Sequence, residues 1–320
     1  MIKKILTYFV LFILLVNTSV KAQTEIKVGV FMNDFIVTTS EPRFYADFYW
    51  WCKVPLSVDE ELVDDYAYID FVNATADIVN VINEKRVFED CYYIAGNCKG
   101  YFNYYPEFKD YPRDKHRVPL IIESVNHPIE TIVLVPDEIT YSNQDFQGYN
   151  ESINANEFKV LGAHFHQSSK VYNTSFGTID ADTKTSYSRL SYDIEIKRKS
   201  FSYQIKIIIP CLLLSIIAYL VFFIPASKLE VVVSCTVTSL LACIAVQFTT
   251  LGDIPRVGYI TKSDLIFYLF YSLFCFALIQ SVYTYNMERK GKEERAKIFR
   301  VVCRVVYPFL IFFGLFSILH

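Results

Sequence analysis

Four apolar segments, each close to the length of a membrane-spanning helix, make up most of the C-terminal part of the chain. A helix needs about 20 apolar residues to cross a bilayer, where the backbone must satisfy its own hydrogen bonds. The sequence therefore predicts a transmembrane domain of four helices over residues 204–320. The helices are expected at about residues 207–224, 229–250, 265–285 and 301–319.

The preceding part, residues 23–203, has a different pattern, which is typical of β-strands. Short runs rich in Val, Ile, Tyr and Phe, such as RFYADFYWW and RLSYDIEIKR, are separated by Pro, Asn, Asp and Gly. No long stretch has the period of an amphipathic helix, so the pattern favours a β-sandwich or barrel. The expected fold class is an extracellular or periplasmic β-sandwich followed by a four-helix transmembrane bundle.

The N-terminus has the organisation of a secretory signal. Lys3 and Lys4 precede an apolar run from Ile5 to Val16, which is too short to span a bilayer. A plausible cleavage site follows at residues 20–22, so residues 1–22 are predicted to be a signal peptide. The alternative is an uncleaved N-terminal anchor.

The link between the third and fourth apolar segments fixes the expected topology, because cytoplasmic loops are enriched in basic residues. Four spans then place both the β domain and the C-terminus outside the cell, in agreement with a signal peptide. The basic residues of this link are Arg289, Lys290, Lys292, Arg295, Lys297 and Arg300.

Composition excludes several functions. With 52% hydrophobic residues and a formal charge of −3, the chain is too apolar for an ordinary soluble domain and too neutral for a nucleic-acid binder. It shows neither a nucleophile–base constellation nor metal-ligand spacing, so we expect no enzyme activity, cofactor or metal. His164 and His166 share a strand face, but solvated histidines are the simpler interpretation.

The stretch CYYIAGNC resembles a hairpin, with Gly96 and Asn97 near its turn. That geometry would place Cys91 opposite Cys98, close enough for a disulfide in an oxidising compartment. Two free thiols are the alternative.

The second apolar segment carries a polar stripe. At about 100° per residue, its six stripe positions fall within an arc of roughly 80°. Such a stripe suits a water-filled path between several copies of the chain, whereas hydroxyls that hydrogen-bond to neighbouring helices are the alternative. Val237 is assigned to the far side of the helix. The stripe residues are Glu230, Ser234, Thr238, Leu241, Ala245 and Phe248.

Three stretches carry a resemblance to a known family. DIEIKRKSFSYQIKIIIP resembles its junction between the last strand and the first helix, and EFKDYPRDKHRV its Pro–aromatic–Asp loop. SKLEVVVSCTVTSLLACIAVQFTTLGDIPRVGYIT resembles its pore helix and the loop that follows. Together with the order of signal peptide, β domain and four spans, they resemble the pentameric ligand-gated ion channels, the Cys-loop receptor superfamily, and more specifically its prokaryotic branch.

The signature loop departs from the family pattern. Arg113 stands where an aromatic residue is usual, and no cysteines flank the loop. The cytoplasmic link is also much shorter than the intracellular domain of animal receptors. The absence of flanking cysteines and the short link favour a bacterial member in the inner membrane.

The resemblance implies a homopentamer in membrane lipid, opened by a small-molecule or proton agonist. The second helix would line the pore. Glu230 would form a ring of acids at the cytoplasmic mouth and favour monovalent cations, while Leu241 and Phe248 would form apolar rings. The alternative is a membrane-anchored binding or sensory protein of the same fold with little or no conduction.

The resemblance also implies site residues. Agonist would bind between subunits, near an acid and the aromatic residues of an early segment and of a capping hairpin. Coupling to the pore would pass through an ion pair between Asp114 and Arg198, and through the loop that contains Pro255. Aromatic packing and an ordinary surface ion pair are the alternatives. The candidate ligand residues are Tyr66, Tyr68, Glu123, Tyr172 and Tyr187.

Overall fold

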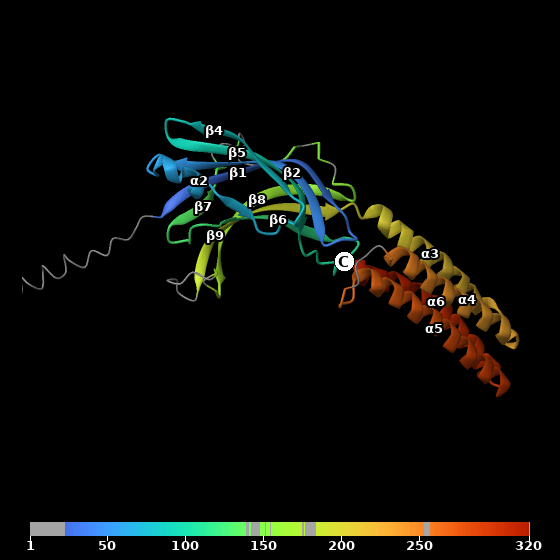
Figure 1. Ribbon diagram of the computed structural model, residues 1–320. Coiled ribbons are helices and arrows are strands. Elements are labelled where there is room, and N and C mark those ends of the chain that lie inside the picture. Colours follow the sequence, from blue (N-terminus) through green and yellow to red (C-terminus); the bar gives the residue numbers. More distant parts are fainter. Residues whose placement is uncertain are drawn as a thin grey trace, which may run out of the picture.

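The computed structural model describes residues 23–138, 141, 148–150, 152–153, 155–174, 176, 184–252 and 257–319. The predicted signal peptide and Pro255 lie outside these residues. Figure 1 shows an elongated molecule, with a β-sandwich at one end and a bundle of four long helices at the other. The predicted fold class is confirmed.

Two sheets form the sandwich. The first has the order β4 (Val79–Val87), β5 (Cys91–Asn103), β2 (Arg43–Pro55), β1 (Thr24–Val37) and β7 (Ile132–Pro136). The second has the order β3 (Ile69–Phe71), β6 (Lys115–Ser124), β9 (Thr185–Arg198) and β8 (Phe158–Tyr172). A short 3-10 turn, η1 (Glu60–Leu62), and helix α2 (Val63–Tyr66) join β2 to β3.

The core lies between the two sheets and follows from the alternation of the strands. Every second residue of β2, from Phe44 to Val54, is buried. Phe48 packs against Phe71 of β3 and Phe102 of β5, with ring centroids 5.1 and 5.8 Å away. Each such side chain contributes about 1.5–3 kcal/mol on burial, so the sandwich is a firm support for the loops at its ends.

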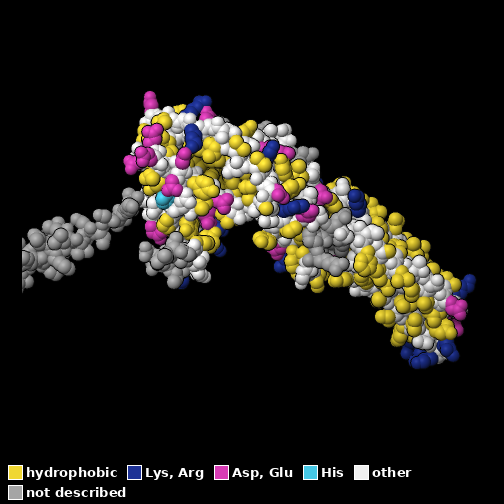
Figure 2. Space-filling model, viewed as in Figure 1, with side chains coloured by type: hydrophobic (Ala, Val, Ile, Leu, Met, Phe, Trp, Pro, Cys, Tyr) yellow, Lys and Arg dark blue, Asp and Glu magenta, His cyan; other side chains and the backbone are white. Residues whose placement is uncertain are grey.

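The bundle consists of α3 (Phe201–Leu220), α4 (Leu229–Leu251), α5 (Lys262–Arg289) and α6 (Glu293–Leu319). Two short turns, η3 (Val221–Phe223) and η4 (Ala226–Lys228), link α3 to α4. All four helices are long and apolar enough to cross a membrane. In Figure 2, hydrophobic side chains cover the bundle, and Lys and Arg gather at its far tip, where α5 meets α6.

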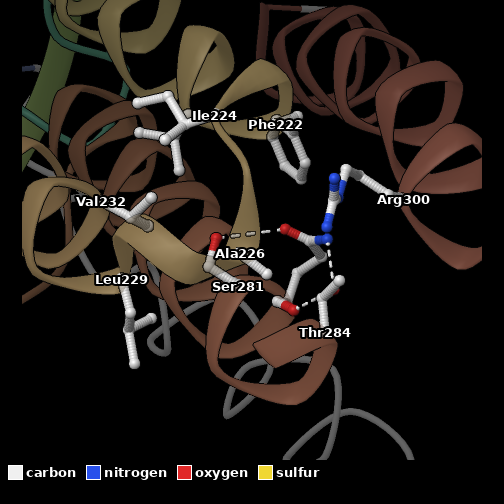
Figure 3. A pocket seen from close by; sticks show the side chains of 10 residues that line it. Phe222, Ile224, Ala226, Leu229, Val232, Ser281, Thr284 and Arg300 are labelled. Atoms are coloured by element: carbon white, nitrogen blue, oxygen red, sulfur yellow. Dashed lines mark hydrogen bonds between the residues drawn. The ribbon is translucent and has the colours of Figure 1, made fainter. Parts of the chain in front are cut away.

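The far end of the bundle is held by polar contacts around a small cavity (Figure 3). Gln280 Nε2 donates to Thr284 Oγ1 at 2.8 Å, and Arg304 Nη2 donates to the carbonyl oxygen of Phe222 at 2.9 Å. Arg300 of α6 also lines the cavity, whose volume of about 10 Å³ suits one water molecule. These contacts fix the η3–η4 link, and with it the start of α4.

The predicted hairpin at residues 91–98 is wrong. β5 is one continuous strand that pairs with β2 along its whole length. Cys91 and Cys98 therefore lie about 23 Å apart along the strand, and both are free thiols, so the predicted disulfide is wrong too. Gly96 is not a turn residue. An added Cβ there would come within 2.6 Å of the carbonyl oxygen of Val81 and 2.7 Å of the Trp50 ring.

Candidate functional site

All six stripe residues of α4 are exposed in the single subunit. The exposed fraction reaches 61% at Leu241 and 76% at Phe248. The opposite face packs against the bundle, and its residues Val232, Thr236, Ser239 and Cys243 are at most 2% exposed. The other helices of the same subunit therefore do not cover the polar stripe of α4.

The hydroxyl groups of α4 fall into two sets. On the buried face, Thr236 Oγ1 donates to Val232 O at 2.8 Å and Ser239 Oγ donates to Cys235 O at 2.9 Å. Within the described part of the chain, the hydroxyls of Ser234 and Thr238 make no hydrogen bond to another helix. The exposed hydroxyls are thus not used to join helices of one subunit.

Val237 does not lie on the far side of α4, contrary to our expectation. Its side chain is 39% exposed. Seven residues is nearly two full helical turns, so Val237 returns to within about 20° of Glu230 and borders the stripe. Val232, which is 2% exposed, is the residue that faces the bundle.

The candidate ligand site gathers side chains from β6, β8 and β9 around one carboxylate. Tyr172 OH donates to Glu123 Oε1 at 2.9 Å. Arg189 Nε and Nη2 donate to Glu123 Oε2 at 2.8 and 2.6 Å. The Glu123 and Arg189 side chains are only 10% and 19% exposed, so both oxygens of this acid are engaged by the protein itself.

Three aromatic rings lie beside this ion pair, at the end of the β8–β9 hairpin. The centroid of the Tyr172 ring is 5.2 Å from that of Phe176 and 5.9 Å from that of Tyr187. Burial raises the pKa of Tyr172, and its hydrogen bond to Glu123 adds to this shift, so the hydroxyl stays a donor. Sequence reasoning missed Arg189 and Phe176. The alternation of β9 could have marked Arg189 as a neighbour of Tyr187, but not as the partner of Glu123.

The two other predicted ligand residues have different neighbours. The Tyr66 ring packs 4.6 Å from that of His127, whose Nε2 is hydrogen-bonded to Asp65 Oδ2 at 2.6 Å. Tyr68 lines a separate cavity of about 180 Å³, next to Trp50. The structure therefore brings together Glu123, Tyr172 and Tyr187, while Tyr66 and Tyr68 lie elsewhere.

The junction between sandwich and bundle holds a buried ion pair. Arg198 Nε donates to Asp114 Oδ1 at 2.7 Å and Nη2 donates to Oδ2 at 2.8 Å, with both side chains fully buried. Arg198 Nη1 also reaches Thr39 Oγ1 and Glu157 Oε2, each at 2.8 Å.

His116 completes this junction, since its Nε2 is hydrogen-bonded to Asp114 Oδ2. Burial alone would raise the pKa of the Asp114 carboxyl. Hydrogen bonds from His116 and Arg198, and the charge of Arg198, nevertheless hold that pKa below its usual range. Asp114 is therefore a permanent acceptor at neutral pH.

The loop at residues 108–113, which precedes Asp114, contacts the helices directly. Phe108 N donates to Tyr259 OH at 2.7 Å, and Ser263 Oγ donates to Tyr111 O at 3.1 Å. Arg113, which replaces the aromatic residue of the family pattern, donates from Nη1 to Leu319 O at 2.5 Å. The loop is thus fixed to both α5 and the end of α6.

Among the described residues, no group of three or more His, Cys, Asp or Glu side chains could hold a metal ion. His164 and His166 are exposed on β8.

Comparison with known proteins gives relatives of one kind. No family model matches the chain. It is 20% identical over 198 residues to pH-sensitive chloride channel 2 of Drosophila melanogaster, covering 59% of this chain and 36% of the relative. It is 26% identical over 121 residues to the proton-gated ion channel of Gloeobacter violaceus, covering 38% of this chain and 33% of that relative. It is 32% identical over 114 residues to neuronal acetylcholine receptor subunit beta-2 of Gallus gallus, covering 33% and 22%.

The sandwich followed by four apolar helices agrees with relatives of this kind. The chain is therefore similar to pentameric ligand-gated ion channels, at low identity. It spans about a third of the length of the first curated relatives it matches.

Four apolar helices, together with similarity to membrane channels, support a multi-pass membrane protein. All three relatives have channel or receptor names, and none has the name of an enzyme. This similarity alone does not fix charge selectivity, since one of the relatives is named a chloride channel.

Proposed function

We propose that the chain forms a homopentameric, ligand-gated, cation-selective channel in a cell membrane, with α4 lining the pore. The observation that carries this proposal is the exposed stripe of α4, opposed by a buried face. One subunit has no room to enclose the stripe. In five copies around an axis, the stripe would face a water-filled pore enclosed by the five α4 helices. The remaining helices would contact lipid.

Cation selectivity rests on Glu230. This carboxylate is exposed in the first turn of α4, at the end of the bundle where basic residues gather. Five carboxylates at one mouth would concentrate cations and repel anions. Further along the stripe, Leu241 and Phe248 would form apolar rings that stop ions in the closed state by excluding water.

Agonist would act from outside, at the end of the β8–β9 hairpin, where Glu123, Tyr172 and Tyr187 meet. The buried Asp114–Arg198 pair and the contacts of residues 108–113 would carry the change to α5 and α6. The loop that contains Pro255 belongs to the same boundary in this proposal. Two relatives have pH or proton in their names, so protons are the first agonist to test, followed by small organic molecules.

The proposed setting is a bacterial inner membrane, with the sandwich and the end of α6 outside and the basic α5–α6 link inside. The contact between Arg113 and Leu319 supports this topology, because it places the end of α6 at the sandwich side of the bundle. In this setting the protein has no enzyme activity, cofactor or nucleic-acid partner.

The direct test is a reversal potential. The protein is purified, placed in liposomes and activated by pH steps or a ligand panel across a salt gradient. The current should reverse near the equilibrium potential of the cation. Glu230→Ala should shift the reversal potential towards zero or towards anion values. An unchanged value would remove Glu230 from selectivity. Native mass spectrometry that shows only monomers would contradict the pentamer.

A second function is favoured by the wide apolar side chains at Leu241 and Phe248. Rings of these residues would suit a binding or sensory protein that conducts little. Measurable agonist binding, with no current at any pH or ligand concentration, would select this alternative.

A further inference from the structure

The carboxylate of the candidate ligand site already has a cation bound to it. Glu123 Oε2 accepts two hydrogen bonds from Arg189, and Oε1 accepts one from Tyr172. Arg189 Nη2 also donates to the Tyr172 hydroxyl at 3.2 Å. The guanidinium thus sits between an acid and the aromatic residue beside it.

Without Arg189, the same side chains would form a site for an organic cation. A carboxylate that is 90% buried would keep its hydrogen bond from Tyr172 but lack a charged partner, and the rings of Tyr172, Phe176 and Tyr187 lie next to it. An acid bordered by aromatic rings binds ammonium groups through charge and through the ring faces. The arginine occupies the place that such a group would take.

The position of Arg189 follows from the strands and not from a mobile side chain. Glu123 of β6 and Arg189 of β9 are direct partners in the antiparallel register. The pair is the last of the β6–β9 register, and each backbone is also held on its other side, Glu123 by Asp70 of β3 and Arg189 by Ser168 of β8. The guanidinium is 19% exposed. A free amine at ordinary concentrations competes poorly with a cation that is tethered at this distance.

We propose that Arg189 is a specificity-determining residue, whose guanidinium fills the cation subsite and excludes amine ligands from Glu123. This inference deepens the proposed function, since it concerns the ligand site of the proposed channel. It follows that the agonist of this protein is not a simple amine bound at Glu123. It also follows that removing one side chain uncovers an amine site.

The test is calorimetric binding to the full chain in detergent, with n-butylamine as the probe and n-butanol as its uncharged counterpart. Arg189→Ala should bind n-butylamine at least about tenfold more tightly than the unsubstituted protein does. In this variant the ammonium group of the probe replaces the charged partner that Glu123 has lost. It should prefer the amine to the alcohol. Ethylguanidinium should bind this variant as well, since it replaces the missing group.

Three further variants make the result specific. Glu123→Gln combined with Arg189→Ala should lose the preference for the amine. Arg189→Lys, which keeps a tethered cation, should exclude n-butylamine. Arg117→Ala removes an exposed arginine elsewhere on β6 and should leave amine binding at the level of the unsubstituted protein.

The proposal is overturned if the unsubstituted protein binds n-butylamine as tightly as Arg189→Ala, or if that variant folds and does not prefer the amine. Should Arg189→Ala fail to fold, Arg189→Gln decides by the same two criteria, because its amide can still donate to Glu123. Binding is measured without current. A non-conducting protein would therefore leave this proposal standing, and a negative binding result would leave the channel proposal standing.

Discussion

Strands β6 and β9 run side by side between two arginine–carboxylate pairs, one at each end. At the end next to the β8–β9 hairpin, Glu123 pairs with Arg189, and both side chains keep some exposure. At the end next to the helices, Asp114 pairs with Arg198, and both are fully buried. The two pairs are roughly 30 Å apart along the strands.

The difference in burial separates two roles for the same chemistry. A partly exposed pair can lose one member by substitution at moderate cost, because water reaches the group that is left, which suits a site where the arginine decides which ligands are excluded. A fully buried pair leaves an uncompensated charge when it is broken, so it suits a fixed connection between domains. His116, Thr39 and Glu157 add hydrogen bonds to the junction pair, whereas among the described residues the hairpin pair gains one further partner, Tyr172.

The largest effect should come from Arg198→Ala. Removal of one member of a buried pair typically costs about 3–5 kcal/mol, so the variant should unfold at much lower temperature or fail to assemble. Arg189→Ala is the matched control, because it removes the same group from the partly exposed pair. If chemical or thermal unfolding in detergent shows equal losses for the two variants, then burial does not distinguish the pairs.

Acid should weaken the junction pair in a defined direction. The folded-state pKa of Asp114 is below its usual range, so its charge stabilises the fold above the unfolded pKa of about 4. That contribution should disappear as pH falls through the folded pKa. The difference in unfolding free energy between the unsubstituted protein and Asp114→Asn should be constant at neutral pH and shrink below about pH 4. A difference that grows on acidification would contradict this assignment.

The smallest effect should come from Tyr172→Phe. This change removes the hydrogen bond to Glu123 Oε1 and keeps the ring, so we expect a loss of about 1 kcal/mol in stability. It should also loosen the exclusion of amines less than Arg189→Ala does. Parallel unfolding and n-butylamine titrations measure both. A loss as large as that of Arg198→Ala would mean that the hairpin cluster is as rigid as the junction.

The exposed face of a helix can be predicted well from the sequence, whereas the register between strands cannot. The α4 stripe follows from a helical period within one segment, and all six of its residues are exposed, although Val237 beside them is exposed as well. The partnership of Glu123 with Arg189 depends on the register between two strands far apart in sequence, which no local pattern contains.

The two errors in the predicted strands have separate origins. β4 was not anticipated, because nearly all of its residues are exposed and it lacks the alternation of a half-buried strand. The false hairpin at residues 91–98 arose from Gly96, a glycine required by the neighbouring Trp50 ring and not by a turn. The contact that explains Gly96 is with Trp50 of β2, which lies far away in sequence, whereas β4 and β5 are consecutive strands paired with each other.

The central claim is that the exposed face of α4 lines an ion pore. The most direct test compares leak currents of variants that are present at the cell surface in equal amounts. Leu241→Ser should hydrate the apolar ring and raise spontaneous current or agonist sensitivity. Val232→Ser, on the buried face, should reduce expression or stability and leave the current per channel unaltered. If Leu241→Ser leaves both leak and agonist response unchanged while Val232→Ser opens the channel, the pore is lined by a different face and the account is wrong.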